Sequence, residues 1–245
     1  GGAANPDAKV DYLFGPEIAR GGMGSILEAE DCKLPRTVAV KIILSEIGAD
    51  DDQKQRFINE AAVLAKLAHP NIVPVYDIGR DADGQLYYSM KLVKGRTLKS
   101  ILGDLRDGEE SGVGILPSPP SDTGGRMPRP HYTLERLLTV FRKVCDAMAF
   151  AHSKGIIHRD LKPENIMVGE FGEVQVMDWG LAKVSGAAEV GSDDFDDDES
   201  STVREFISRR GDIKGTLAYM PPEQARGEID ELDPRADVFA LGAIL

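Results

Sequence analysis

The run His158–Asn165, with the sequence HRDLKPEN, constrains this chain more than any other segment. It places a carboxylate, a lysine and an amide in one short loop, at Asp160, Lys162 and Asn165. Asp160 can accept a proton from an attacking hydroxyl group, and Lys162 can neutralise negative charge on a phosphoryl group in transfer. Asn165 offers an amide oxygen to a divalent cation. Because phosphoryl transfer depends on positioning and charge neutralisation, this combination indicates that chemistry.

The same run resembles the catalytic loop of the eukaryotic-like (Hanks-type) protein kinases, in which His-Arg-Asp is followed four residues later by Asn. The resemblance implies a serine/threonine protein kinase domain of bacterial type that uses ATP and Mg²⁺. Its fold would be α+β with two lobes, a β-rich N-lobe with one long helix and a mainly helical C-lobe that is incomplete at Leu245. The alternative for the run is a polar surface loop after a helix, and the motifs below weigh against it.

Length and charge narrow the classes of protein that this chain can belong to. Its 245 residues are enough for one large domain or two small ones. A net charge of −12 argues against nucleic acid as the main partner, although part of that charge lies in the acidic run 193–199. No apolar run approaches the ~18–20 residues of a membrane span, and Cys32 and Cys145 form no zinc or disulfide framework. We therefore expect a cytoplasmic domain without a membrane segment.

The resemblance implies that the chain divides into a tail at residues 1–9, an N-lobe with its hinge at 10–93 and a C-lobe at 94–245. The N-lobe pattern predicts strands around one helix, and that helix spans residues 51–67 because its apolar positions recur at helical spacing. Strands first and helices later favour the α+β class.

In the C-lobe, we expect a short helix at 97–102, followed by a flexible insertion at 103–132 that is rich in Gly, Pro, Ser and Asp. Thr133 is then expected to cap a long amphipathic helix. The predicted buried stripe of that helix consists of Leu134, Leu137, Leu138, Phe141, Val144, Cys145, Met148 and His152.

The segment Ile18–Ile26 resembles the glycine-rich loop of the kinases, with Ala19 in place of the first glycine. Glycine lets the backbone approach phosphate groups closely and donate N–H groups to them. Taken alone, the pattern fits a hairpin turn better, but its position shortly before the strand that ends in Lys41 favours nucleotide binding. The residues of this loop that the resemblance implies in nucleotide binding are Ile18, Ala19, Gly21, Gly22, Met23, Gly24 and Ile26.

Lys41 and Glu60 are expected to form an ion pair. A lysine on a strand usually faces solvent, but Glu60 lies in the apolar stripe of its helix and a buried charge needs a partner. Kinases of this family pair these two positions, which implies that Glu60 orients Lys41 toward the α- and β-phosphates of ATP. The alternative is that Glu60 pairs with Arg56 on the surface of the same helix.

The triplet Asp178-Trp179-Gly180 stands where the family has Asp-Phe-Gly. The resemblance implies that Asp178 and Asn165 hold Mg²⁺, and that Trp179 packs beneath the Glu60 helix. It also implies a set of residues around the adenine ring: Ala39, the gatekeeper Met90, the hinge residues Lys91 and Val93, and Met167.

The activation segment is expected to be unusually long, at residues 178–223. Its end, with Thr216, resembles the serine/threonine branch of the family. The resemblance implies that Arg159 receives a phosphate from this segment, and we rank Ser208 first as the phosphorylated residue, ahead of Thr202. The acidic run 193–199 fits a solvated insertion, and the alternative is a tethered segment that mimics a phosphate.

The expected partners are ATP and proteins with Ser or Thr hydroxyl groups, including the chain's own activation segment, and a homodimer is a further expectation. Two other classes of protein remain open at this point. A nucleotide-binding pseudokinase would fit Ala19 and Trp179, but the catalytic residues argue against it. A small-molecule kinase of related fold would not require the activation segment described above.

Overall fold

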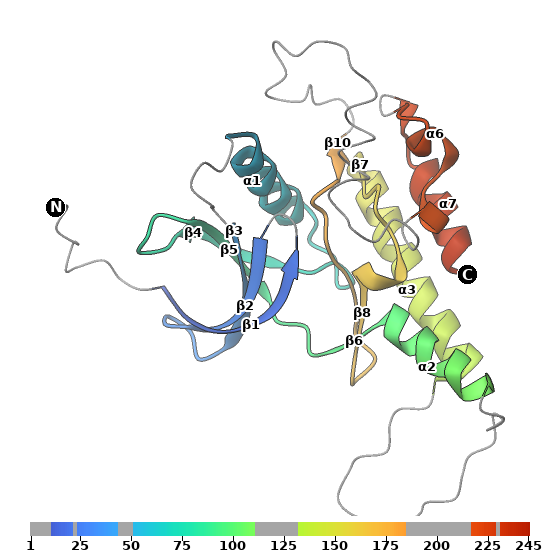
Figure 1. Cartoon of the computed structure of the whole chain (residues 1–245), viewed down its shortest axis with the longest axis horizontal. Helices are drawn as coiled ribbons and strands as arrows, with labels where there is room; N and C mark the ends of the chain where they lie inside the picture. Colours follow the sequence, from blue (N-terminus) through green and yellow to red (C-terminus); the bar gives the residue numbers. More distant parts are fainter. Residues whose placement is uncertain (1–10, 22–23, 44–50, 111–131, 185–216, 229–230) are drawn as a thin grey trace, which may run out of the picture.

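The computed structural model describes residues 11–21, 24–43, 51–110, 132–184, 217–228 and 231–245. The N-terminal part is an antiparallel sheet of five strands in the order β1-β2-β3-β5-β4, packed against helix α1 (Figure 1). The elements are β1 (Tyr12–Gly21), β2 (Gly24–Asp31), β3 (Thr37–Ile43), α1 (Asp51–Lys66), β4 (Val75–Arg80) and β5 (Leu86–Lys91). Helix α1 lies within one residue of the predicted range 51–67.

The later part of the chain is mainly helical and lies to one side of the sheet (Figure 1). Its helices are α2 (Leu98–Glu110), α3 (Leu134–Ser153), α6 (Pro222–Ala225) and α7 (Arg235–Ile244), with short 3-10 turns η1 (Pro163–Asn165) and η2 (Leu217–Tyr219). Its short strands are β6 (Gly95–Thr97), β7 (Ile156–Ile157), β8 (Ile166–Gly169), β9 (Val174–Val176) and β10 (Lys183–Val184). The predicted α+β, two-lobed arrangement is confirmed.

One apolar core extends through both lobes. It joins buried residues of α1, such as Phe57, to those of the sheet and of α3. The ring of Phe57 lies 5.0 Å from that of Tyr88 on β5. The loop after α1 also pairs with β9, because Val176 N–H donates to Asn71 O at 2.8 Å and Val73 N–H donates to Val176 O at 3.3 Å. These bonds connect the loop after α1 to β9, which pairs with β8.

The helix predicted at 97–102 is longer than expected, and this corrects the start of the insertion predicted at 103–132. Helix α2 continues to Glu110. Leu98 and Ile101 are buried, and Leu102 and Leu105 pack against the same core, so the helical apolar period passes through Gly103 without a break. Residues 111–131 lie outside the described part of the chain.

Helix α3 begins at the predicted cap, but its buried face differs from the predicted stripe. Thr133 Oγ1 accepts a hydrogen bond from Arg136 N–H at 3.3 Å. Leu134 and Leu138 are 72% and 46% exposed. The buried residues of the helix are Val140, Val144, Ala147, Met148 and Ala151. The two alanines lie on the buried face because small side chains allow close contact between elements, and a count of large apolar residues overlooks them.

Trp179 packs where the sequence predicts. Its side chain is only 1% exposed and shares the core with Leu64 of α1. Its ring lies 4.6 Å from that of His158, and its indole N–H donates to Val176 O at 3.4 Å. A buried indole usually finds such an acceptor, so tryptophan fits the place of the family's phenylalanine.

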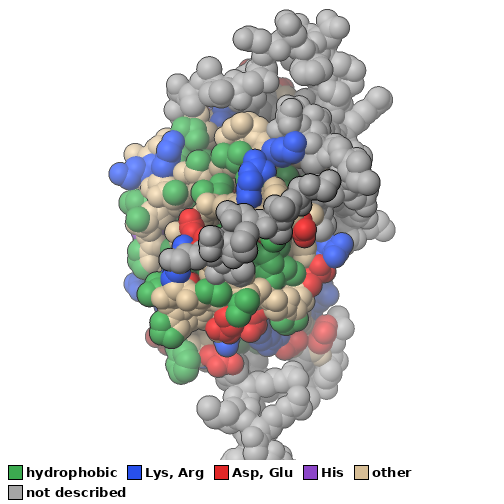
Figure 2. Space-filling view, turned by 90° about the vertical axis from the view of Figure 1, so that its left-hand side faces the viewer, with side chains coloured by type: hydrophobic (Ala, Val, Ile, Leu, Met, Phe, Trp, Pro, Cys, Tyr) green, Lys and Arg blue, Asp and Glu red, His purple; other side chains and the backbone are tan. Residues whose placement is uncertain are grey.

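Figure 2 views the molecule from the side of the five-stranded sheet, where apolar, basic and acidic side chains share one face. The edge strands β1 and β4 contribute exposed apolar residues, among them Leu13 and Ile78. In the described part of the chain, no helix combines the length and apolar character needed to cross a bilayer.

Candidate active site

The loop after β7 brings together the three residues on which the predicted chemistry depends. Asp160, Lys162 and Asn165 are all less than 10% exposed. Asn165 Nδ2 donates to the backbone oxygen of Asp160 at 2.8 Å and to its carboxylate Oδ2 at 2.9 Å. Lys162 Nζ lies 3.3 Å from Asp160 Oδ1. The amide and the ammonium group thus hold the Asp160 carboxylate from two sides.

The backbone of this loop is anchored by Asp237 on α7, which is 1% exposed. Its Oδ2 accepts a hydrogen bond from His158 N–H at 2.9 Å, and its Oδ1 accepts one from Arg159 N–H at 2.9 Å. His152 Nε2 lies 2.7 Å from Oδ2 of the same carboxylate. Three nitrogen atoms thus surround one buried carboxylate. Asp237 therefore braces the backbone of this loop.

The imidazole of His158 connects two functional motifs. Its Nδ1 accepts a hydrogen bond from Asp160 N–H at 3.2 Å, so Nε2 carries the proton and donates to Met177 O at 3.1 Å. Met177 directly precedes Asp178. The histidine thereby ties the catalytic loop to the Asp178-Trp179-Gly180 triplet.

Two of these loop residues have left-handed backbone conformations. The φ angles are +63° for Arg159 and +59° for Asp178. Such angles are uncommon for residues with a Cβ and cost about 1–3 kcal/mol, so they persist only where neighbouring contacts impose them. Strain of this kind gathers at functional sites, and here it occurs at both predicted catalytic motifs.

The predicted pair between Lys41 and Glu60 is present. Lys41 Nζ lies 2.7 Å from each carboxylate oxygen of Glu60. The side chains are 12% and 2% exposed. Burial of an unpaired carboxylate would be costly, and the lysine on β3 relieves that cost. This contact decides between the two partners considered for Glu60.

Tyr88 is a member of this cluster that the sequence analysis missed. Its hydroxyl donates to Glu60 Oε1 at 2.8 Å. Burial, together with the negative charges of Glu60 and Asp178, raises the pKa of the Tyr88 hydroxyl well above its ordinary value. Only the register of β5 against β3, which pairs Tyr88 with Lys41, could have revealed that Tyr88 belongs to this cluster.

The chemistry of Asn165 and Asp178 fits a magnesium ion. The amide nitrogen of Asn165 is engaged with Asp160, which leaves the amide oxygen as its ligand atom. Met177 N–H donates to Asn165 O at 2.9 Å, so the two candidate ligands lie on connected backbone. The described residues contain no group of three or more His, Cys, Asp or Glu side chains suited to a metal. Magnesium commonly uses one or two protein oxygens with phosphates and water.

The glycine-rich segment forms the β1–β2 hairpin, and residues 22–23 at its tip lie outside the described part of the chain. A Cβ on Gly24 would lie 2.3 Å from Ile42 O on β3. Gly24 is therefore required by strand packing as well as by any approach of phosphate. Below the tip, Glu17 joins the two strands: it accepts from Arg20 Nε at 3.0 Å and from Ser25 Oγ at 2.5 Å. These hydrogen bonds, that from Arg20 foremost, lower the pKa of Glu17 to about 2.

The residues predicted to surround adenine lie on the five-stranded sheet, on the predicted hinge and, for Met167, on β8. Ala39 and Met90 are paired across β3 and β5, and both are buried. Lys91 N–H donates to Pro74 O at 3.1 Å, so its backbone carbonyl is the group of this residue that could contact adenine. The others are partly exposed apolar side chains: Ile18, Ile26, Val93 and Met167.

The predicted phosphorylation sites Thr202 and Ser208, the regulatory residue Thr216 and the acidic run 193–199 lie outside the described residues. Arg159, their predicted receptor, donates through Nε to Leu181 O just after the triplet.

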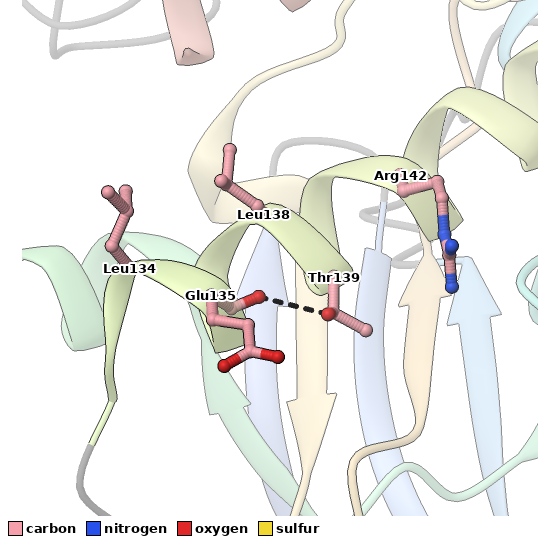
Figure 3. A pocket seen from close by; sticks show the side chains of 5 residues that line it. All are labelled: Leu134, Glu135, Leu138, Thr139 and Arg142. Carbon is pink, nitrogen blue, oxygen red and sulfur yellow. Dashed lines mark hydrogen bonds between the residues drawn. The ribbon is translucent and has the colours of Figure 1, made fainter.

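A separate hollow of about 560 Å³ lies on α3, lined by Leu134, Glu135, Leu138, Thr139 and Arg142 (Figure 3). None of the residues predicted to bind ATP lines it. The hollow lies toward the start of α3, whereas the catalytic loop follows the end of that helix. It is therefore distinct from the site described above.

Comparison with known proteins agrees with this geometry. Residues 12–245 match the model of the protein kinase domain family. The chain belongs to that family. It is 39% identical over 234 residues to the serine/threonine-protein kinase PknD of Protochlamydia amoebophila, covering 96% of this chain and 22% of the relative. The proteins of the same name from Chlamydia caviae and Chlamydia trachomatis serovar D are each 36% identical over 93% of the chain. The chain spans 22–23% of the length of these relatives.

In this kinase domain, replacement of Glu60 by glutamine should lower kcat/KM for ATP about a hundredfold, because Lys41 loses the charge that orients it. Steady-state phosphoryl-transfer rates at varied ATP concentration measure this. Glu228→Gln is the control, since Glu228 pairs with Arg226 at 2.6 Å on the surface and such pairs contribute little. Equal effects of the two substitutions would contradict a special role for Glu60.

Tyr88→Phe should change how the stability of the kinase domain depends on alkaline pH. Tyrosine in the unfolded chain ionises near pH 10, whereas the raised pKa keeps Tyr88 protonated in the folded state. Above pH 10 the unfolded state binds fewer protons, so this group lowers the free energy of unfolding by up to about 1.4 kcal/mol per pH unit. The phenylalanine variant lacks this contribution and should lose stability less steeply. Urea unfolding between pH 8 and 11 tests this, and parallel curves would refute it.

Proposed function

We propose that this domain transfers the γ-phosphoryl group of ATP to serine or threonine hydroxyl groups of proteins. The observation that carries the proposal is the assembled catalytic loop, in which Asn165 and Lys162 hold the Asp160 carboxylate. The buried Lys41–Glu60 pair adds the cation that the reaction needs. The curated relatives are named serine/threonine kinases, which favours this substrate class.

In the proposed mechanism, Asp160 orients the substrate hydroxyl and accepts its proton. Lys162 neutralises charge on the phosphoryl group, and Lys41, held by Glu60, neutralises charge on the other phosphates. Asn165 and Asp178 would hold Mg²⁺, which when bound supplies further positive charge at the phosphate oxygens. Most of the catalysis then comes from positioning and electrostatic stabilisation.

A nucleotide-binding pseudokinase is the second candidate, favoured by Ala19 in the glycine-rich loop. The intact set of Lys41, Asp160, Asn165 and Asp178 weighs against it, because a domain that only binds nucleotide has no use for a base. ATP and Mg²⁺ as ligands, a cytoplasmic location and a homodimer stay predictions.

Asp160→Asn should reduce phosphoryl transfer about 10²- to 10⁴-fold, since an amide cannot accept the proton. Asn165 could still donate to the amide oxygen of the new side chain, so we expect ATP binding to persist. Transfer of labelled γ-phosphate to casein, beside calorimetric titration with ATP, measures both quantities. Asp233→Asn is the control, because Asp233 pairs with Arg235 on the surface. Equal transfer by Asp160→Asn and wild type would favour a different base or a contaminating kinase.

We further propose that the domain phosphorylates its own activation segment, with Ser208 ahead of Thr202 as the acceptor and Arg159 as the receptor of the phosphate. Thr216 is proposed to belong to the part of that segment that meets the substrate. Mass spectrometry after incubation with ATP should find phosphate on Ser208 in wild type and on no residue of the segment in Asp160→Asn. Ser208 that remains unmodified while casein is phosphorylated would refute this site.

A further inference from the structure

We propose that Gln224, on α6 just after the activation segment, is a positioning residue for phosphoryl transfer. Its side-chain amide Nε2 donates to the backbone carbonyl of Arg159, the residue directly before Asp160, at 2.9 Å. The inference rests on the proposed function, because it names a residue that prepares the proposed base for its role.

The peptide group between Arg159 and Asp160 is held at both of its polar atoms. Gln224 binds its carbonyl oxygen, and the imidazole of His158 accepts its N–H at 3.2 Å. A peptide group is planar, so these two contacts fix its rotation. That rotation determines where the Asp160 side chain begins, and hence where its carboxylate lies.

The residue between these contacts is strained. Arg159 has a φ of +63°, and its own N–H is bound by Asp237 Oδ1 at 2.9 Å. Left-handed residues other than glycine keep such a conformation only where several contacts determine it together. Two side chains from separate helices, Asp237 on α7 and Gln224 on α6, supply these contacts. Loss of the Gln224 bond leaves the carbonyl side of the strained residue without its restraint.

The burial of Gln224 indicates a role beyond packing. The residue is 6% exposed, and among the described residues no donor pairs with its Oε1. Burial of a polar atom without a partner lowers stability. A methionine would fill a similar volume without this cost, so the described contacts give glutamine one advantage here, its bond to Arg159.

Gln175 on β9 provides a matched control. It is 4% exposed, its Nε2 donates to Pro70 O at 2.8 Å, and its Oε1 also has no partner among the described residues. The chemistry and burial of the two glutamines are therefore alike. Gln175 binds the loop after α1, whereas Gln224 binds the catalytic loop, so only the location of the bond differs.

The test compares Gln224→Met with Gln175→Met in the intact natural protein, by transfer of labelled phosphate from ATP to casein. A small displacement of a catalytic group can cost up to about a hundredfold. We expect kcat to fall about ten- to a hundredfold in Gln224→Met, with KM for ATP within about twofold of wild type. Gln175→Met should keep kcat within about twofold of wild type, even if its thermal midpoint shifts as much as that of Gln224→Met.

Hydrogen exchange of the backbone amides in residues 156–162 provides a readout independent of activity. We expect faster exchange there in Gln224→Met than in wild type or Gln175→Met. Unchanged exchange and kcat in Gln224→Met, or equal losses in both variants, would overturn the inference. If wild-type protein transfers no phosphate, the proposed function fails, and exchange alone then decides whether Gln224 restrains the loop.

Discussion

The catalytic loop of this kinase domain depends on a buried carboxylate that lies far along the chain. Asp237 accepts hydrogen bonds from the N–H groups of His158 and Arg159. At Arg159, directly before Asp160, the backbone adopts a left-handed conformation. An isolated loop with this sequence would not favour that conformation, because it is less stable for a residue with a Cβ. The geometry of the proposed base therefore depends on the docking of α7.

The N-lobe holds a charge that would be unfavourable alone. Glu60 on α1 is buried, and it is stabilised by Lys41 from β3 and the hydroxyl of Tyr88 from β5. Because such bonds act only at short range, they fix α1 against the sheet. The loop after α1 is in turn hydrogen-bonded to Val176 of β9, shortly before the Asp178 motif. The position of Lys41 and the arrangement of the lobes thus depend on neighbouring contacts.

Sequence reasoning succeeded where the relevant information is local. The range of α1 and the cap at Thr133 followed from spacing and capping preference. The cost of a buried charge indicated that Glu60 needs a partner, and the resemblance to the kinases implied that this partner is Lys41. It failed where a large side chain was taken as the mark of burial. Leu134 is exposed, whereas the face of α3 that meets the core includes the small residues Ala147 and Ala151. The helix predicted at 97–102 ends before Gly103. Apolar residues recur at helical spacing on both sides of this glycine, however, and Leu102 and Leu105 pack against the core.

The sequence by itself determined which chemistry we propose for this domain, because the residue types in the loop at 158–165, at Lys41 and at Asp178 suit phosphoryl transfer. Only the tertiary structure decided how these groups are held. Tyr88 beside Glu60, the need for glycine at position 24 and the bond from Gln224 to Arg159 all depend on strand register or helix docking. Such contacts join residues far apart in sequence, and no local pattern encodes their distance.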